Sequence, residues 1–169
     1  MSSRNGNVRW KRLTVRFIYC RIYYIRAVQT IEVSIDVMWE FVSNQMSKDE
    51  FVKWWKDSLS TSGKKRNQWQ MKAIQEKPAE QWDVSILCYA ILNCGVLKFN
   101  ASQKDSVMKL RDIRNVYIFH RRVGEMNFGE YVKVLNESMK SYEGLLGEDW
   151  QLYVKQLEDI NNCETFIKT

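Results

Sequence analysis

WDVSILCYAILNCGVL, residues 82–97, is the most apolar stretch of the chain and decides the fold. Its hydrophobic side chains fall on nearly all sides of a helical projection, which is typical of a helix buried within a bundle. Each Leu or Ile that is fully buried there contributes roughly 1.5–3 kcal/mol to stability. We therefore predict that residues 82–97 form a central buried helix, with Gly95 ending its regular part.

Amphipathic patterns predict further helices on both sides of this stretch. They cover residues 48–58, a short segment at 69–74, residues 100–122, 128–146 and 150–162. Ser47 with Glu50 is a capping box, and Asn127 with Glu130 resembles one. Gly147 is placed to end the helix that follows Asn127.

IEVSIDV, residues 31–37, alternates apolar and polar side chains as a strand does. A single strand would have no partner in this chain, so we expect it to join a helix that runs to about Ser43. Met38, Phe41 and Val42 would be its buried face. One proline and seven glycines also favour helices joined by short loops over a sandwich or barrel. The sequence therefore predicts an all-α, up-and-down bundle of about five helices.

The N-terminal segment differs from the rest in charge. Residues 1–31 hold seven Lys or Arg and no acid, whereas the whole chain has a net charge of +6, so the remainder is close to neutral. Arginines interrupt the apolar residues too often for a membrane span. A mitochondrial presequence and a basic helix on a membrane or nucleic acid both remain open. We expect residues 1–30 to be a loosely packed extension, 31–162 the helical domain and 163–169 a frayed tail.

Four cysteines, at 20, 88, 94 and 163, show neither metal-binding spacing nor a disulfide pattern. Cys88 and Cys94 lie in an apolar run, where free thiols behave as small core residues. We expect a reducing, cytoplasmic setting, no metal site and no cofactor. No phosphate-binding loop or dinucleotide fingerprint is present in the sequence.

KLRDIRNVYIFHRR, residues 109–122, carries the candidate chemistry and the only histidine of the chain, His120. A histidine exchanges protons near neutral pH. An arginine fork such as that of Arg114 binds a phosphate and stabilises charge on it. The amide of Asn115 can hold a phosphate oxygen or a hydroxyl. These three types suffice, without a metal, for attack of an RNA 2′-hydroxyl on its own phosphate.

Geometry limits this hypothesis. On a straight helix Arg114 and His120 lie about 120° apart around the axis and ~9 Å apart along it. Transesterification needs both an acid and a base, whereas one chain has one imidazole. A two-fold dimer would supply two copies of each group to one cleft. In the alternative interpretation His120 caps a helix, and Arg114 pairs with Asp112 or with a carboxylate on a neighbouring helix.

Other residues could contact RNA around this site. The predicted helix at residues 100–122, which carries Arg114 and His120, is called the motif helix below. The candidates are its basic residues, an aromatic ring one turn from Arg114, and the basic tip of the loop at residues 60–67. They are Arg111, Tyr117, Arg121, Arg122, Lys64, Lys65 and Arg66.

Five runs also carry a resemblance to a known family. They are KRNQW at 65–69, QWDVSIL at 81–87, ILN at 91–93, LRDIRNVYIFH at 110–120 and FGEY at 128–131. Over roughly residues 40–147 the chain resembles the HEPN superfamily, specifically the HEPN-like domain of the DAZ-interacting zinc-finger ubiquitin ligases and of invertebrate innate-immunity proteins. The family motif is an Arg, often followed by a polar residue, and a His after four to six intervening residues. Arg114, Asn115 and His120 match it.

The resemblance implies a helical bundle that dimerises through the motif helices. It implies RNA binding, with metal-independent endoribonuclease activity as one expected function. The alternative is a non-catalytic module for dimerisation or for binding a protein partner, in an innate-immunity or ubiquitin-ligase-type protein. The chain has no Cys and His cluster that could build a zinc-binding RING, so ligase activity itself is not implied.

Overall fold

The computed structural model describes residues 4–61, 69–119 and 125–162. Every regular element in these ranges is helical, and the helices pack into an all-α bundle, as the sequence predicts. The α-helices are α1 Arg4–Ser43, α2 Lys48–Thr61, α3 Trp69–Glu76, α4 Val84–Leu92, α5 Ala101–Arg114, α6 Phe128–Leu146 and α7 Val154–Asn162. Two 3₁₀ segments, Ala79–Gln81 and Gly147–Tyr153, and a π-helical turn, Asn115–Phe119, complete them.

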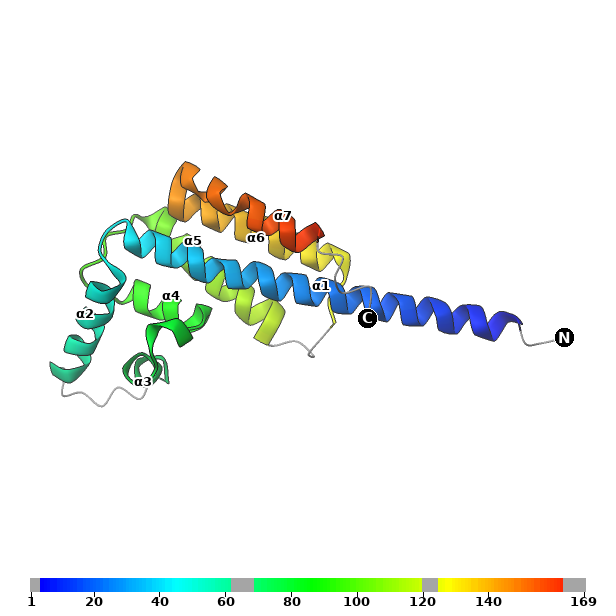
Figure 1. Ribbon diagram of the computed structural model, residues 1–169, viewed down its shortest axis with the longest axis horizontal. Helices are drawn as coiled ribbons and strands as arrows, with labels where there is room; N and C mark the ends of the chain where they lie inside the picture. The colour runs from blue at the N-terminus through cyan, green and yellow to red at the C-terminus, as the bar shows by residue number, and fades with distance from the viewer. Residues whose placement is uncertain (1–3, 62–68, 120–124, 163–169) are drawn as a thin grey trace.

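Helix α1 organises the bundle (Figure 1). Its C-terminal half packs against α4, α5, α6 and α7, and its N-terminal end extends alone beyond the other helices. The strand-like segment at 31–37 lies within α1, and the three side chains Met38, Phe41 and Val42 are buried, as predicted. The helix is continuous across residues 30 and 31, where Thr30 and Ile31 are both buried.

Helix α4 is the central buried helix, but it is shorter than predicted. It spans Val84–Leu92 instead of residues 82–97. Asn93 N still donates to Tyr89 O as in an α-helix, and the Asn93 side-chain amide donates to the same oxygen. The α-helical pattern ends at the next residue, where Cys94 N bonds to Ile91 O at 3.4 Å. Cys94 and Leu97 follow outside the helix and are still buried. The apolar run therefore continues past the helix end because the connection to α5 also lies in the core.

Side-chain caps begin four of the described α-helices, which are α2, α4, α5 and α6. Ser47 and Glu50 form the predicted capping box of α2, with reciprocal bonds of 3.2 and 3.1 Å. Asn127 Oδ1 accepts from Glu130 N at the start of α6, as predicted. Gly147 ends α6 with a φ of 59°, a region that glycine adopts readily. Beyond it the chain forms a 3₁₀ segment before α7, so the predicted last helix begins later than expected.

A row of buried polar groups joins α1 to α6. Tyr142 OH donates to Thr30 O at 2.6 Å and lies 3.0 Å from Ser34 Oγ. All three residues are buried. Because each of these three groups has a partner, their burial avoids the cost of an unsatisfied polar group.

Helices α5 and α6 approach each other closely at Gly144. A Cβ atom added there would overlap Ser106 Oγ and lie 3.3 Å from Ser106 Cβ. Overpacking of this kind costs about 1–3 kcal/mol, against ~1 kcal/mol gained by alanine within a helix. We therefore expect Gly144→Ala to lower the free energy of unfolding, measured by urea denaturation.

Gly129→Ala is the matched control on the same helix, because its Cβ would lie at an ordinary 3.4 Å from Asn127 Oδ1. The double variant Ser106→Ala with Gly144→Ala should recover part of the loss, since it removes the nearest obstructing atom. A Gly144→Ala protein more stable than wild type would contradict the close approach.

Candidate functional site

Arg114 is the last residue of α5, and its side chain reaches the start of α4. Its Nη2 lies 3.2 Å from Asp83 Oδ2, and its Nη1 donates to Asn115 Oδ1 at 3.1 Å. The Arg114 side chain is 20% exposed. A guanidinium held by two oxygens has a defined orientation, and solvent can still reach it.

Asp83 has two roles at this site. Its Oδ1 accepts from Ile86 N at 2.9 Å and so caps the N-terminus of α4. Its Oδ2 is the oxygen that faces Arg114. A carboxylate is favourable at a helix N-terminus and beside a guanidinium, so one side chain stabilises both partners. The contact joins the central helix to the motif helix.

The helix changes its winding directly after Arg114. Residues Asn115–Phe119 form a π-helical turn, which is wider than an α-helical one. Asn115 N donates to both Arg111 O and Asp112 O at the junction. The straight α-helix assumed in estimating the angle between Arg114 and His120 therefore does not extend past Asn115. Single π-turns are frequent at functional sites.

The structure separates the other candidates of the motif helix. Arg111 is half-buried, and its Nε lies 3.6 Å from the carboxylate of Asp112. Tyr117 is buried, so its ring belongs to the core and offers no exposed face for a base. Val116 is exposed. His120, Arg121, Arg122, Lys64, Lys65 and Arg66 lie outside the described residues.

Sequence reasoning missed Asp83 as a site residue. It expected Arg114 to pair with Asp112 or with a carboxylate on a neighbouring helix, and the partner in the structure is of the second kind. An Asp directly before the apolar residues that begin at Val84 is an N-cap signal, which could have placed this carboxylate at the start of α4. Nothing in the sequence relates that cap to a guanidinium 31 positions away.

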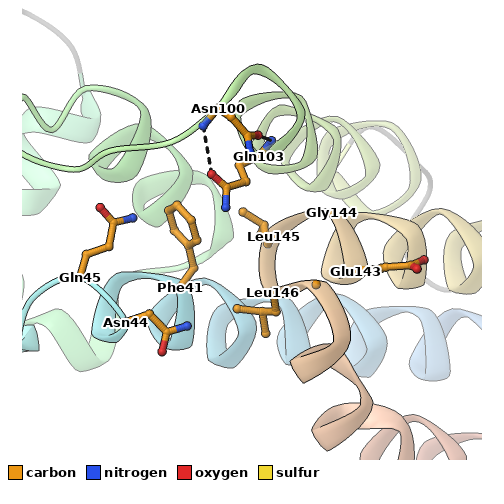
Figure 2. Close-up of a pocket in the computed structure, with 10 residues that line it drawn as sticks. Phe41, Asn44, Gln45, Asn100, Gln103, Glu143, Gly144, Leu145 and Leu146 are labelled. Atoms are coloured by element: carbon orange, nitrogen blue, oxygen red, sulfur yellow. Dashed lines mark hydrogen bonds between the residues drawn. The ribbon is translucent and has the colours of Figure 1, made fainter.

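A cavity of about 470 Å³ lies at the other end of α5, between the C-terminal ends of α1 and α6 (Figure 2). Amide side chains at the edge of this cavity form hydrogen bonds with neighbouring residues. Gln45 pairs with both backbone groups of Lys98, and Asn100 and Gln103 form the capping box of α5. These groups hold the loop and helix start in place. The cavity is about 20 Å from Arg114, the length of α5.

Within the described ranges, no three His, Cys, Asp or Glu side chains gather as a metal site would require. In the same ranges, no helix combines the length and the apolar character that crossing a membrane demands. Comparisons with protein-family models, with curated proteins and with solved structures gave no match to this chain.

Proposed function

We propose that this chain is an RNA-binding helical domain in which Arg114 and Asn115 hold a phosphate group at the end of α5. The observation that carries the proposal is the orientation of Arg114. Its guanidinium is fixed between Asp83 and Asn115 and is still reached by solvent. A positioned arginine fork matches the geometry of a phosphate. The π-helical turn that begins at Asn115 and the resemblance to the HEPN superfamily support the same site.

We further propose metal-independent cleavage of the bound RNA. One His120 accepts the proton of the 2′-hydroxyl as that oxygen attacks the phosphorus, and a second His120 donates a proton to the 5′-oxygen as its bond to phosphorus breaks. Arg114 stabilises the charge that develops on the phosphate. Two imidazoles are needed for acid and base, so the active form is a two-fold dimer through the motif helix. Exposed Val116, on the turn after Arg114, is apolar surface that such a dimer would bury.

A second candidate function follows from the same ion pair. Asp83 compensates the charge of Arg114 within one chain, so the pair can act only to lock α4 against α5. The chain would then be a non-catalytic module that assembles with itself or with a protein partner. Under this alternative, Arg114→Ala changes oligomeric state or stability and leaves RNA properties unchanged.

Incubation of single-stranded RNA with the protein in EDTA tests the first proposal. We expect products ending in 2′,3′-cyclic phosphate, and a loss of about 10²–10⁴-fold in rate for His120→Ala. Arg114→Ala should lose both cleavage and part of the affinity. Lys109→Ala is the matched control, since it removes a cation of the same helix that faces Glu137, at 3.6 Å. Equal cleavage by wild type and His120→Ala, or none by either, rejects catalysis.

Asp83→Asn separates the two functions, because asparagine keeps the helix cap and removes the negative charge. If Arg114 binds phosphate, this variant keeps or gains RNA affinity in a salt-dependent titration. If the ion pair is only structural, light scattering or denaturation changes and RNA binding does not. Asp83→Ala, which also loses the cap, measures the contribution of the cap.

A further inference from the structure

Four aromatic rings from two distant parts of the chain form a continuous row. Tyr19 and Tyr23 of α1 stack with centroids 6.4 Å apart. Tyr23 in turn stacks on Tyr131 of α6 at 5.8 Å and contacts Phe128 at 5.4 Å. These separations are those of favourable ring pairs. The row joins the extending part of α1 to the start of α6.

The row runs from the core into solvent. Tyr131 is buried and anchors its inner end, whereas Tyr19 is 48% exposed and Phe128 is 59% exposed. Figure 1 shows that α1 continues past the N-terminal end of α6, where none of the other described helices runs beside it. The rings of Tyr19 and Phe128 therefore face solvent, and their packing against the buried end of the row holds them in place.

Arginines bracket the row on its own side of α1. Arg16, Tyr19, Tyr23 and Arg26 are spaced by three, four and three residues and fall within about 80° around a helix. Arg16 is exposed, and Arg26 is half-buried. The Nε atom of Arg26 is buried and has no hydrogen-bond partner among the described residues. The surface thus combines exposed rings with cationic donors at both ends.

Charge decides what kind of partner fits this surface. Residues 1–31 contain seven Lys or Arg and no acid, so a polyanion is attracted and a second copy of the same segment is repelled. A helix lying on a membrane separates an apolar face from a charged one. Arg21 lies about 140° around the helix from both Arg16 and Arg26, so α1 carries charge on opposite sides and lacks that separation.

The row is also connected to the motif helix. Met126, buried just before α6, donates its backbone N–H to Cys20 O at 3.2 Å, beside Tyr19. Only seven peptide steps separate Met126 from Phe119 at the end of the π-helical turn, at most ~25 Å of chain. One RNA strand held at Arg114 can therefore extend to this row.

We propose that the exposed rings of Tyr19 and Phe128, held in place by Tyr23, form a stacking platform for bases of single-stranded RNA. Arg16 and Arg26 would hold the adjoining phosphates. Aromatic rings combined with arginines bind single strands with little sequence preference, because every base has a face that stacks. Paired bases in a duplex are not free to stack there. The inference rests on the proposed RNA-binding function and specifies its substrate class.

Fluorescence anisotropy with a labelled single-stranded oligoribonucleotide of about ten nucleotides tests the platform on the full chain. We expect Tyr19→Ala and Phe128→Ala each to weaken binding by about ten-fold, and Tyr19→Phe to bind as wild type. Arg16→Ala should reduce the slope of log K against log salt by about 0.7. Leu152→Ala is the matched control, because it removes an exposed side chain far along the sequence from the row.

Several outcomes overturn the platform. The first is that Tyr19→Ala and Phe128→Ala both bind the oligonucleotide as tightly as wild type. The second is that both variants lose as much affinity for a duplex of the same length. The third is that they lose binding to anionic vesicles, or change oligomeric state, while their affinity for RNA is unchanged. Failure of the phosphate site is distinguishable from these. If Arg114→Ala binds the oligonucleotide as tightly as wild type while Tyr19→Ala does not, the platform stands and the Arg114 site does not. Circular dichroism verifies that each variant keeps its helices.

Discussion

Trp82→Ala is expected to lower the free energy of unfolding by about 3–5 kcal/mol. Trp82 is 2% exposed and stacks on Trp39 at 5.9 Å and against Phe51 at 6.4 Å. Its Nε1–H donates to Lys77 O at 3.2 Å. Removing the indole leaves a cavity between α1, α2 and α4 and a backbone carbonyl without its donor. Such a loss is a large part of the 5–15 kcal/mol typical of a domain.

Chemical denaturation followed by circular dichroism measures this effect. Trp69→Ala is the matched control: Trp69 is 54% exposed, so removing its indole should change stability by less than about 0.5 kcal/mol. Trp82→Phe should cost less than Trp82→Ala, since a ring remains to fill most of the space. Similar losses for Trp82→Ala and Trp69→Ala would show that Trp82 does not occupy the core.

The second large effect is a loss of stability in alkaline solution. Burial raises the pKa of the Cys88 thiol from 9.0 to about 12. Below pH 9 the thiol is protonated in both the folded and the unfolded chain. Between pH 9 and about 12 the unfolded chain releases this proton and the folded chain keeps it, so the free energy of unfolding falls as pH rises. The slope is at most ~1.36 kcal/mol per pH unit for each such proton.

Tyr142 adds to this effect in the same direction. Burial raises the pKa of its hydroxyl well above the usual value, because the phenolate would lie in the core between α1 and α6. The measurement is urea denaturation at several pH values from 8 to 10.5. In Cys88→Ala the free energy of unfolding should fall less steeply with pH, by at most the contribution of one proton. The variant also starts from a lower stability. An unchanged slope in Cys88→Ala would show that the thiol ionises in the folded protein.

Local patterns were sufficient for much of the fold. The capping box at Ser47, the cap at Asn127 and the glycine at 147 are short-range signals, and the structure confirms each of them. The strand-like alternation at residues 31–37 was interpreted correctly as helix, because an isolated strand has no hydrogen-bond partner. Val107, Leu110 and Ile113 recur at three-residue steps in the sequence, which is typical of the buried face of a helix, and all three are buried.

The length of α4 could not be predicted from hydrophobicity. Cys94 and Leu97 are as apolar as the helix before them, but they are buried in a connection and not in a helix. Hydrophobicity indicates that a residue is buried, and residues are buried in helices and in buried loops alike. The α4 helix ends after Asn93, whose side-chain amide donates to Tyr89 O. The next backbone N–H, that of Cys94, bonds to Ile91 O and so leaves the α-helical pattern.

By itself, the sequence determined the helical class, most helix starts and the buried faces, because spacing along a helix and capping side chains act over a few residues. It also brought Arg114 and Asn115 together as neighbours on one helix. Only the tertiary structure decided that Asp83 orients Arg114 and that Tyr23 meets Phe128. These contacts join segments 31 or more positions apart, and their partners are set by how α1, α4 and α6 pack.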